Sequence, residues 1–182
     1  RANIGPLAEG KVFEIGCGGG LNQPLYERDK VISFAGIDPN GALLDKARAA
    51  AVEKGWQADI RAAKGEAIPF DDAAFDTVVC TYTLCSVDDE AQVLSELRRI
   101  LKPGGRVLFL EHGKSPDAVP AKWQRRIEPL WKNLMGNCHL TRPVSASVGA
   151  GGLALERVEH KYMEKMPRWA GYMEWGIGRK AA

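Results

Sequence analysis

The 182-residue sequence predicts an α/β fold, in which a mostly parallel seven-stranded sheet with an antiparallel edge strand forms the middle of a three-layer sandwich. Short β-rich apolar runs alternate with amphipathic helical patterns along the first 112 residues, which favours a parallel sheet with right-handed crossovers. The last two strand patterns indicate an antiparallel pair at one sheet edge. No repeat or linker interrupts the pattern, so we expect one domain over residues 1–182.

The individual elements follow from hydrophobic periodicity and from stop signals. Strand patterns occupy Lys11–Ile15, Ser33–Ile37, Asp59–Ala63, Phe75–Thr81, Arg106–Glu111, Leu155–Tyr162 and Gly171–Ile177. Helical patterns occupy Asn22–Glu27, Pro39–Glu53, Asp88–Leu101 and Ser145–Ala154. A Lys-Pro-Gly-Gly turn at residues 102–105 ends the third helix. The stretch 113–149 contains two further helical fragments.

The segment 113–149 is too long to be a simple connection between two elements, and insertions of this length are usually functional. It carries Trp123, Trp131 and Met135, which would pack on the core and form an apolar lid. We expect this insertion to lie on the substrate side of the domain.

Composition excludes several classes of function. The formal net charge of +2 and the absence of a basic stripe argue against a nucleic-acid partner. No apolar run is long enough to span a bilayer. The chain opens at Arg1 rather than Met. A native segment before Arg1 would allow peripheral association with a membrane. The four cysteines form no CxxC pair and have neither zinc-ribbon nor disulfide-scaffold spacing, so we expect reduced thiols, no metal and a cytoplasmic location.

A glycine-rich loop directly follows the first strand. Glycines at a strand end let a ligand approach the backbone, with amide N–H groups pointing at it. The spacing differs from the dinucleotide fingerprint G-x-G-x-x-G, because Leu21 stands at the third glycine position. Glu14, at the strand end, would repel a pyrophosphate and suits a cationic group such as an α-amino group. The pattern is therefore Glu14-x-Gly16-x-Gly18-x-Gly20.

A second acid indicates a nucleoside. Asp38 ends the second strand pattern, where a carboxylate can accept hydrogen bonds from both ribose hydroxyls. It could also cap the helix that begins at Pro39, and the two roles are compatible. The loop from Lys64 to Phe70 follows the third strand pattern and suits an adenine site.

These motifs together resemble class I S-adenosylmethionine-dependent methyltransferases, of the methyltransferase type 11 domain, and so imply a Rossmann-like sandwich. The match runs through Glu14–Gly20, Asp38, Gly65–Phe70, Phe75–Val79 and Leu101–Gly105. Nearly the whole chain is similar to the methyltransferase-like thiol S-methyltransferases, through Ile37–Asn40, Val79–Val87, Glu111-His112, Trp123-Gln124 and Asn137–Arg142. Ubiquinone-type C-methyltransferases and bacterial phospholipid N-methyltransferases share the pattern more distantly.

The resemblance implies S-adenosylmethionine as cofactor and a role for each matched residue. Glu14 would hold the methionine amino group, and the loop from Gly16 through Cys17 and Gly18 to Gly20 would face the methionine carboxylate and the ribose. Asp38 would bind the ribose hydroxyls. The adenine would lie beside Pro39, Gly65 and Glu66, and the methionine portion over Cys80 and Thr81. The sequence departs from many relatives at Lys64, where they carry Asp.

The candidate catalytic residues are His112, at a strand end, and His139, in the insertion. A histidine near neutral pH can deprotonate an incoming nucleophile, but a structural role is an alternative for both. Arg142 would pair either with Glu111 or with an acidic substrate. Little acid–base chemistry is needed, because a sulfonium methyl is already activated and the enzyme must mainly align the reactants and exclude water.

The expected function is methyl transfer to a small, apolar or lipid-like acceptor, with a thiol favoured. Phospholipid or amine N-methylation and quinone-type C-methylation are alternatives. A nicotinamide oxidoreductase is disfavoured by Leu21 and Glu14, and a non-enzymatic cofactor-binding module remains a further alternative.

Overall fold

A computed structural model describes all residues of the chain, 1–182, and confirms the predicted fold class. Seven strands form one sheet in the order β3-β2-β1-β4-β5-β7-β6. Their bounds are β1 Gly10–Ile15, β2 Val31–Asp38, β3 Ala58–Ala62, β4 Phe75–Thr81, β5 Leu101–His112, β6 Ala154–Tyr162 and β7 Tyr172–Arg179. Strands β1 to β5 pair in parallel, and β7 runs antiparallel to both β5 and β6. The antiparallel strand β7 is therefore the second strand from the edge of the sheet, and β6 is the edge strand.

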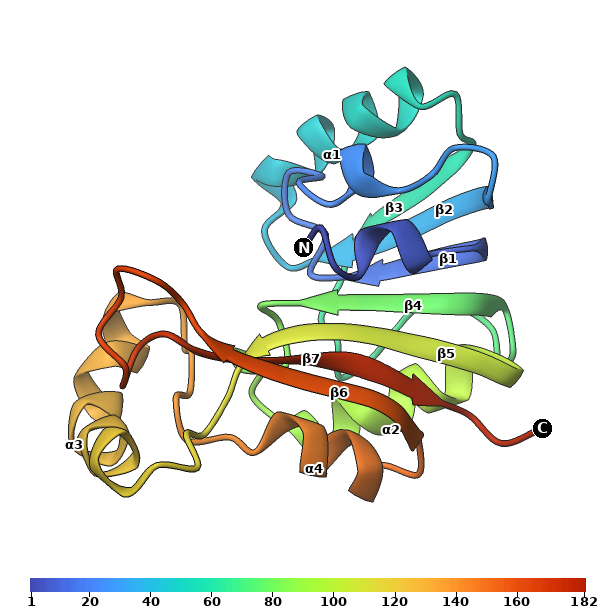
Figure 1. Ribbon diagram of the computed structural model, residues 1–182. Coiled ribbons are helices and arrows are strands. Elements are labelled where there is room, and N and C mark those ends of the chain that lie inside the picture. Colours follow the sequence, from blue (N-terminus) through green and yellow to red (C-terminus); the bar gives the residue numbers. More distant parts are fainter.

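The helices cover both faces of the sheet (Figure 1). Their bounds are α1 Gly41–Glu53, α2 Glu90–Ile100, α3 Ala118–Leu134 and α4 Val144–Ala150, and two short 3₁₀ turns are η1 Gly5–Leu7 and η2 Gln23–Leu25. The pattern Asn22–Glu27 forms only one 3₁₀ turn, which ends where the backbone becomes extended at Tyr26. The two fragments expected in the insertion form the single helix α3 and the start of α4.

Strand residues alternate between two hydrophobic cores, as the period of two requires. Phe13 and Ile15 of β1 pack with α2 and α4 on one face. Val12 packs on the other face with α1 and the N-terminal segment. Buried residues Leu97 and Ile100 anchor α2, and Asp89 caps it by accepting a hydrogen bond from the Gln92 N–H.

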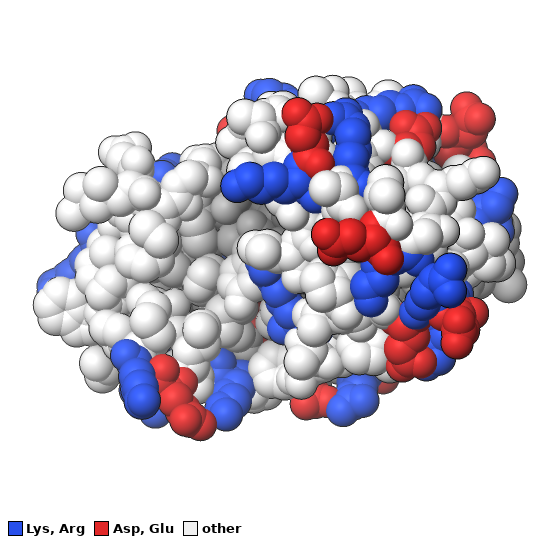
Figure 2. Space-filling view, turned by 90° about the horizontal axis from the view of Figure 1, so that it is seen from above, with Lys and Arg blue, Asp and Glu red and all other residues white.

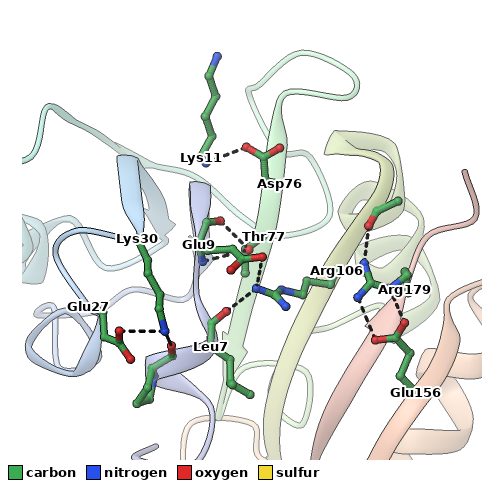
Figure 3. A network of polar contacts seen from close by, with 12 residues as sticks. Leu7, Glu9, Lys11, Glu27, Lys30, Asp76, Thr77, Arg106, Glu156 and Arg179 are labelled. Atoms are coloured by element: carbon green, nitrogen blue, oxygen red, sulfur yellow. Dashed lines mark hydrogen bonds and ion pairs between the residues drawn. The ribbon is translucent and has the colours of Figure 1, made fainter.

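The N-terminal segment is tied to the amino ends of β4 and β5 (Figure 3). The Thr77 hydroxyl donates to the carbonyl of Glu9 at 2.8 Å, and Arg106 binds the Leu7 carbonyl and the Glu9 carboxylate at 2.7 Å each. These contacts lie at the end of the sheet opposite the cavity described below. They fix the entry into β1 and so the start of the glycine loop.

Helix α3 lies beyond the carboxyl ends of β4 and β5, next to the loop that joins β6 to β7 (Figure 1). None of the helices combines the length and hydropathy that crossing a bilayer requires.

Candidate functional site

A cavity of about 300 Å³ opens at the carboxyl ends of the parallel strands. In the space-filling view a hollow separates the largely uncharged lobe at the left from the rest of the molecule (Figure 2). The cavity wall combines four strand ends and their loops with two residues of the insertion. It consists of Ile15, Gly16, Ile37, Asp38, Pro39, Ala63, Lys64, Gly65, Glu66, Tyr82, Thr83, Ser86, Val87, Asp88, Gly136 and Asn137.

Three of the four glycines in the loop adopt a backbone conformation that favours glycine. Their φ angles are positive: 65° at Gly16, 49° at Gly18 and 81° at Gly20. A Cβ on Gly16 would overlap the Thr83 side chain, so Gly16 lets the loop after β4 pack closely against the glycine loop at the cavity wall. A Cβ on Gly20 would lie 3.1 Å from the Ala47 Cα, so Gly20 lets α1 pack closely.

Asp38 is held in place by two backbone N–H groups. Its two oxygens accept hydrogen bonds from Asn40 N at 2.8 Å and from Gly18 N at 2.9 Å. The N-cap of α1 is Asn40, whose side chain accepts from Ala42 N, so the helix starts two residues later than Pro39 and Asp38 is not its cap. The carboxylate therefore joins the glycine loop to the cavity wall.

Glu14 lies beneath the loop and outside the cavity wall. It is 2% exposed and accepts hydrogen bonds from Asn22 Nδ2 at 2.7 Å and from the Tyr26 hydroxyl at 2.8 Å. Burial raises the pKa of its carboxyl to about 7, against the lowering effect of these hydrogen bonds. Asn22 also donates to the Thr81 hydroxyl at 2.8 Å, while its own Oδ1 is buried without a partner. Asn22 and Tyr26 belong to this polar cluster and were not found from the sequence.

The adenine-side residues Pro39, Gly65 and Glu66 all line the cavity. The Glu66 carboxylate accepts from the backbone N–H groups of Asp88 and Asp89, at the start of α2. Lys64 also lines the cavity, and its ammonium lies 3.2 Å from the Asp88 carboxylate. Lys64, at which the sequence departs from many relatives, thus forms an ion pair at the rim of the cavity.

Several predicted cofactor contacts lie behind the wall rather than on it. Cys80 is fully buried, and its thiol lies 3.3 Å from a Glu111 oxygen in the core. Thr81, Cys17, Gly18 and Gly20 do not line the cavity either. Beyond the end of β4 the chain turns, so the next two residues, Tyr82 and Thr83, form the wall.

Tyr82 holds an unusual backbone conformation, with φ of 56°. Such angles are rare for bulky residues and cluster at functional sites, because the surrounding structure must enforce them. Glu111 is part of that enforcement: its buried carboxylate accepts from the N–H groups of Thr83, Leu84 and Cys85. Burial raises the pKa of Glu111.

Arg142 does not pair with Glu111. Its guanidinium donates to the carbonyls of Leu84 and Val87, the latter at 2.8 Å. Arg142 and Glu111 thus hold the same loop from two sides, one through carbonyls and the other through N–H groups.

The two candidate histidines have different surroundings, and neither is part of the cavity wall. The His112 ring packs edge-on against Tyr82, with centroids 5.4 Å apart, and its Nδ1 lies 3.6 Å from Cys138 Sγ. His139 Nδ1 lies 3.5 Å from the Glu128 carboxylate, and burial lowers the pKa of His139. His112 is therefore the histidine joined to the cavity, through Tyr82.

Cys138 also lies 3.6 Å from Cys85. The Cys85 thiol lowers the pKa of Cys138 by hydrogen bonding, and the pKa of Cys85 is correspondingly raised. All four cysteines are free and buried.

A glycine-cradled cavity at the carboxyl ends of a sheet of order 3-2-1-4-5-7-6 defines a nucleoside-binding α/β domain. The methyltransferase domain family matches residues 13–109, more than half of the chain. The chain belongs to this family, and its cofactor is S-adenosylmethionine.

Curated relatives point to particular methyltransferases. The chain is 37% identical to the thiol S-methyltransferase TMT1B of Rattus norvegicus, over 76% of the chain and 57% of that protein. It is 30% identical to the human thiol S-methyltransferase TMT1A, over 86% of the chain and 65% of that protein. A phosphatidylethanolamine N-methyltransferase of Cereibacter sphaeroides is 33% identical over 65% of the chain and 60% of that protein. The chain spans less than two thirds of each of these relatives.

Solved structures share the fold at low identity. The YcgJ protein of Bacillus subtilis superposes with a TM-score of 0.76 at 19% identity, covering 96% of this chain and 93% of that one. The [4+2]-cyclase SpnF gives the same TM-score at 18% identity, covering 100% and 80%. Because a cyclase shares it, the fold alone does not determine the reaction.

The residues present fit S-adenosylmethionine. Gly16 lines the cavity without a side chain of its own, and Asp38 lines the same cavity. The unpartnered Asn22 Oδ1, beside Glu14, is an acceptor suited to an ammonium group.

Proposed function

We propose that this chain transfers a methyl group from S-adenosylmethionine to a small, apolar thiol. The observation that carries the proposal is the 37% identity with a thiol S-methyltransferase over three quarters of the chain. The cavity geometry supports it, since Gly16 and Asp38 lie where the nucleoside part of the cofactor would bind. In this proposal residues 1–182 act as one domain in the cytoplasm, with 113–149 on the substrate side.

The protein's part in the reaction is binding, orientation and exclusion of water. When bound, the cofactor supplies a methyl group on a sulfonium sulfur, an electrophile that needs no further activation. Asp38 would hold the ribose hydroxyls, and the Glu14–Asn22 cluster would favour the cationic amino group from beneath the glycine loop, without lining the cavity. Tyr82 and Asn137 would bound the acceptor side, where exclusion of water on binding would favour in-line attack.

Asp38→Ala is expected to weaken binding of S-adenosylhomocysteine at least tenfold, a loss of about 1.4 kcal/mol. The reason is the loss of the acceptor for the ribose hydroxyls and of the Gly18 contact that shapes the loop. Titration calorimetry measures the change. Asp45→Ala is the matched control, because Asp45 is exposed on α1 and pairs only with Arg48. Unchanged affinity in Asp38→Ala would refute the ribose assignment.

We further propose that His112 promotes ionisation of the acceptor thiol, because only the thiolate is a good nucleophile. His112→Ala should therefore lower the turnover of a thiol most at low pH, and less where the acceptor is already ionised. A pH series of initial rates tests this. An equal loss at every pH would mean a purely structural role.

The alternative acceptor is an amine, supported by the similarity to a phosphatidylethanolamine N-methyltransferase. Turnover on a panel of small thiols, amines and phenols separates the two. The proposal expects the thiols to be the best acceptors, and faster methylation of amines would replace it.

A further inference from the structure

Two thiols and an imidazole meet beside the cavity, outside the cofactor contacts. Sγ of Cys85, Sγ of Cys138 and a ring nitrogen of His112 all lie within 4.8 Å of one another. Cys85 comes from the loop after β4, His112 from the end of β5 and Cys138 from the insertion. Because the three residues are far apart in the chain, their spacing matches no sequence motif for a metal, and the sequence predicted none.

The two separations from Cys138 Sγ are close to those of ligands around one tetrahedral zinc ion, and the third lies within 4.8 Å. With Zn–S near 2.3 Å and Zn–N near 2.0–2.1 Å, tetrahedral geometry places two sulfurs about 3.8 Å apart and a sulfur and a nitrogen about 3.5 Å apart. Cys138 Sγ lies 3.6 Å from Cys85 Sγ and 3.6 Å from His112 Nδ1. A disulfide would need the sulfurs to approach to about 2.05 Å.

The frame that carries the ligands is built before any ion binds. The backbone of Cys85 is held on both sides, since its N–H donates to Glu111 at 3.2 Å and its carbonyl accepts from His139 N at 2.6 Å. Asn137, next to Cys138, donates from Nδ2 to the Ser86 carbonyl at 2.9 Å. The two cysteine-bearing segments are thus locked together, and little ordering remains for a metal to induce.

The side-chain surroundings also suit thiolate ligands. Both cysteines are buried, 1% and 6% exposed, while His112 is only half-buried and leaves a route inward. The indole N–H of Trp131, in α3, is buried without a hydrogen-bond partner, and the Trp131 side chain contributes to lowering the pKa of Cys138.

We propose that Cys85, Cys138 and His112 bind one Zn²⁺ ion through two thiolates and an imidazole. Three protein ligands leave the fourth tetrahedral position open for water or an added ligand. The ion would fasten the insertion to the end of the sheet, because its ligands join three separate segments. Soft thiolate ligands with one imidazole select zinc over magnesium or calcium.

A zinc ion held by His112 would promote ionisation of the acceptor thiol at the open coordination position. This role of the ion rests on the proposed function. A thiol that coordinates zinc is deprotonated, and its proton passes to solvent. Metal binding itself does not depend on methyl transfer. A chain that binds zinc and methylates no thiol would leave the site standing and remove only this role.

The test starts with the full chain, purified with reductant and stripped of metal. Competition against a chromophoric chelator is expected to show one tightly bound Zn²⁺ per chain. Co²⁺ in its place should give intense visible bands and a sulfur-to-cobalt charge-transfer band, which report tetrahedral thiolate ligation. Absence of tight zinc binding, or a weak cobalt spectrum typical of six oxygen ligands, would overturn the proposal.

Variants locate the ion. Cys85→Ser, Cys138→Ser and His112→Ala should each weaken zinc binding at least tenfold and reduce the rise in Tm that zinc causes. Cys17→Ser, which alters a buried cysteine elsewhere, and His160→Ala, on β6, are the matched controls and should bind zinc like the parent chain. Parent-like zinc affinity in the Cys85→Ser/Cys138→Ser chain would place the ion elsewhere and refute the site. If a variant does not fold, the cobalt spectrum of the parent chain still decides.

Discussion

Gly16→Ala is expected to lose both stability and cofactor binding. The positive φ alone costs a residue with a Cβ about 1–2 kcal/mol, and the new methyl group would also displace the Thr83 side chain. Since Thr83 and Gly16 form adjacent parts of the cavity wall, affinity for S-adenosylhomocysteine should fall by at least roughly a hundredfold, about 2.7 kcal/mol. Urea unfolding and calorimetry measure the two losses.

Gly104→Ala separates backbone strain from steric overlap. Gly104 has φ of 74°, but a Cβ there would meet no atom within 4 Å, and the residue lies away from the cavity. The Gly104→Ala variant should be destabilised only by the cost of a positive φ in a residue with a Cβ. Its affinity for S-adenosylhomocysteine should equal that of the parent chain. If both variants kept full affinity, Gly16 would not be part of the cofactor cradle.

The second large effect concerns the pH dependence of stability through Glu14. Its pKa in the folded chain is about 7, above the ordinary value of 4.5, because burial disfavours the carboxylate. Between these two values the folded chain keeps a proton that the unfolded chain has lost. The free energy of unfolding should therefore fall as pH rises through this window, by roughly 3 kcal/mol in total.

Glu14→Gln should remove this contribution, because an amide does not titrate. The stability of the variant minus that of the parent chain should be larger at about pH 8 than at about pH 5, by roughly 2.5 kcal/mol. Urea unfolding of the ligand-free proteins at both pH values measures it. Glu27→Gln, on the surface beside Lys30, is the control that should show no such change. A constant difference between parent and Glu14→Gln would mean that Glu14 is already ionised in the folded chain.

Most of the fold could be predicted because its signals are local. The strand Phe75–Thr81 was predicted with its observed bounds, since a buried parallel strand is a continuous apolar run between turns. The start of α1 was misplaced by two residues, because Pro39 is a common first helical residue but Asn40 makes the capping hydrogen bond. The two helical fragments expected in the insertion correspond to α3, which continues through Pro129, and to the start of α4.

Site residues could be predicted where a local sequence motif determines their position. They could not be predicted where the tertiary structure brings distant residues together. The placement of Gly16 and Asp38 on the cavity wall follows from strand ends and spacing. Cys80 was placed toward the cavity, yet it is buried in the core, and Tyr82, which has a positive φ, lines the cavity instead. The contact between Cys85 and Cys138 joins residues 53 positions apart, and no local pattern encodes it.

The position of β7 sets the order in which the molecule can be completed during synthesis. Strand β6 pairs only with β7, although it leaves the ribosome first, and β5 keeps an open edge until β7 arrives. An open strand edge invites pairing with other chains, so the nascent protein is exposed to aggregation at β5 until β7 has emerged. His112 pairs with Met173 in β7, and the neighbourhood of the two cysteines is therefore completed only after that strand has formed.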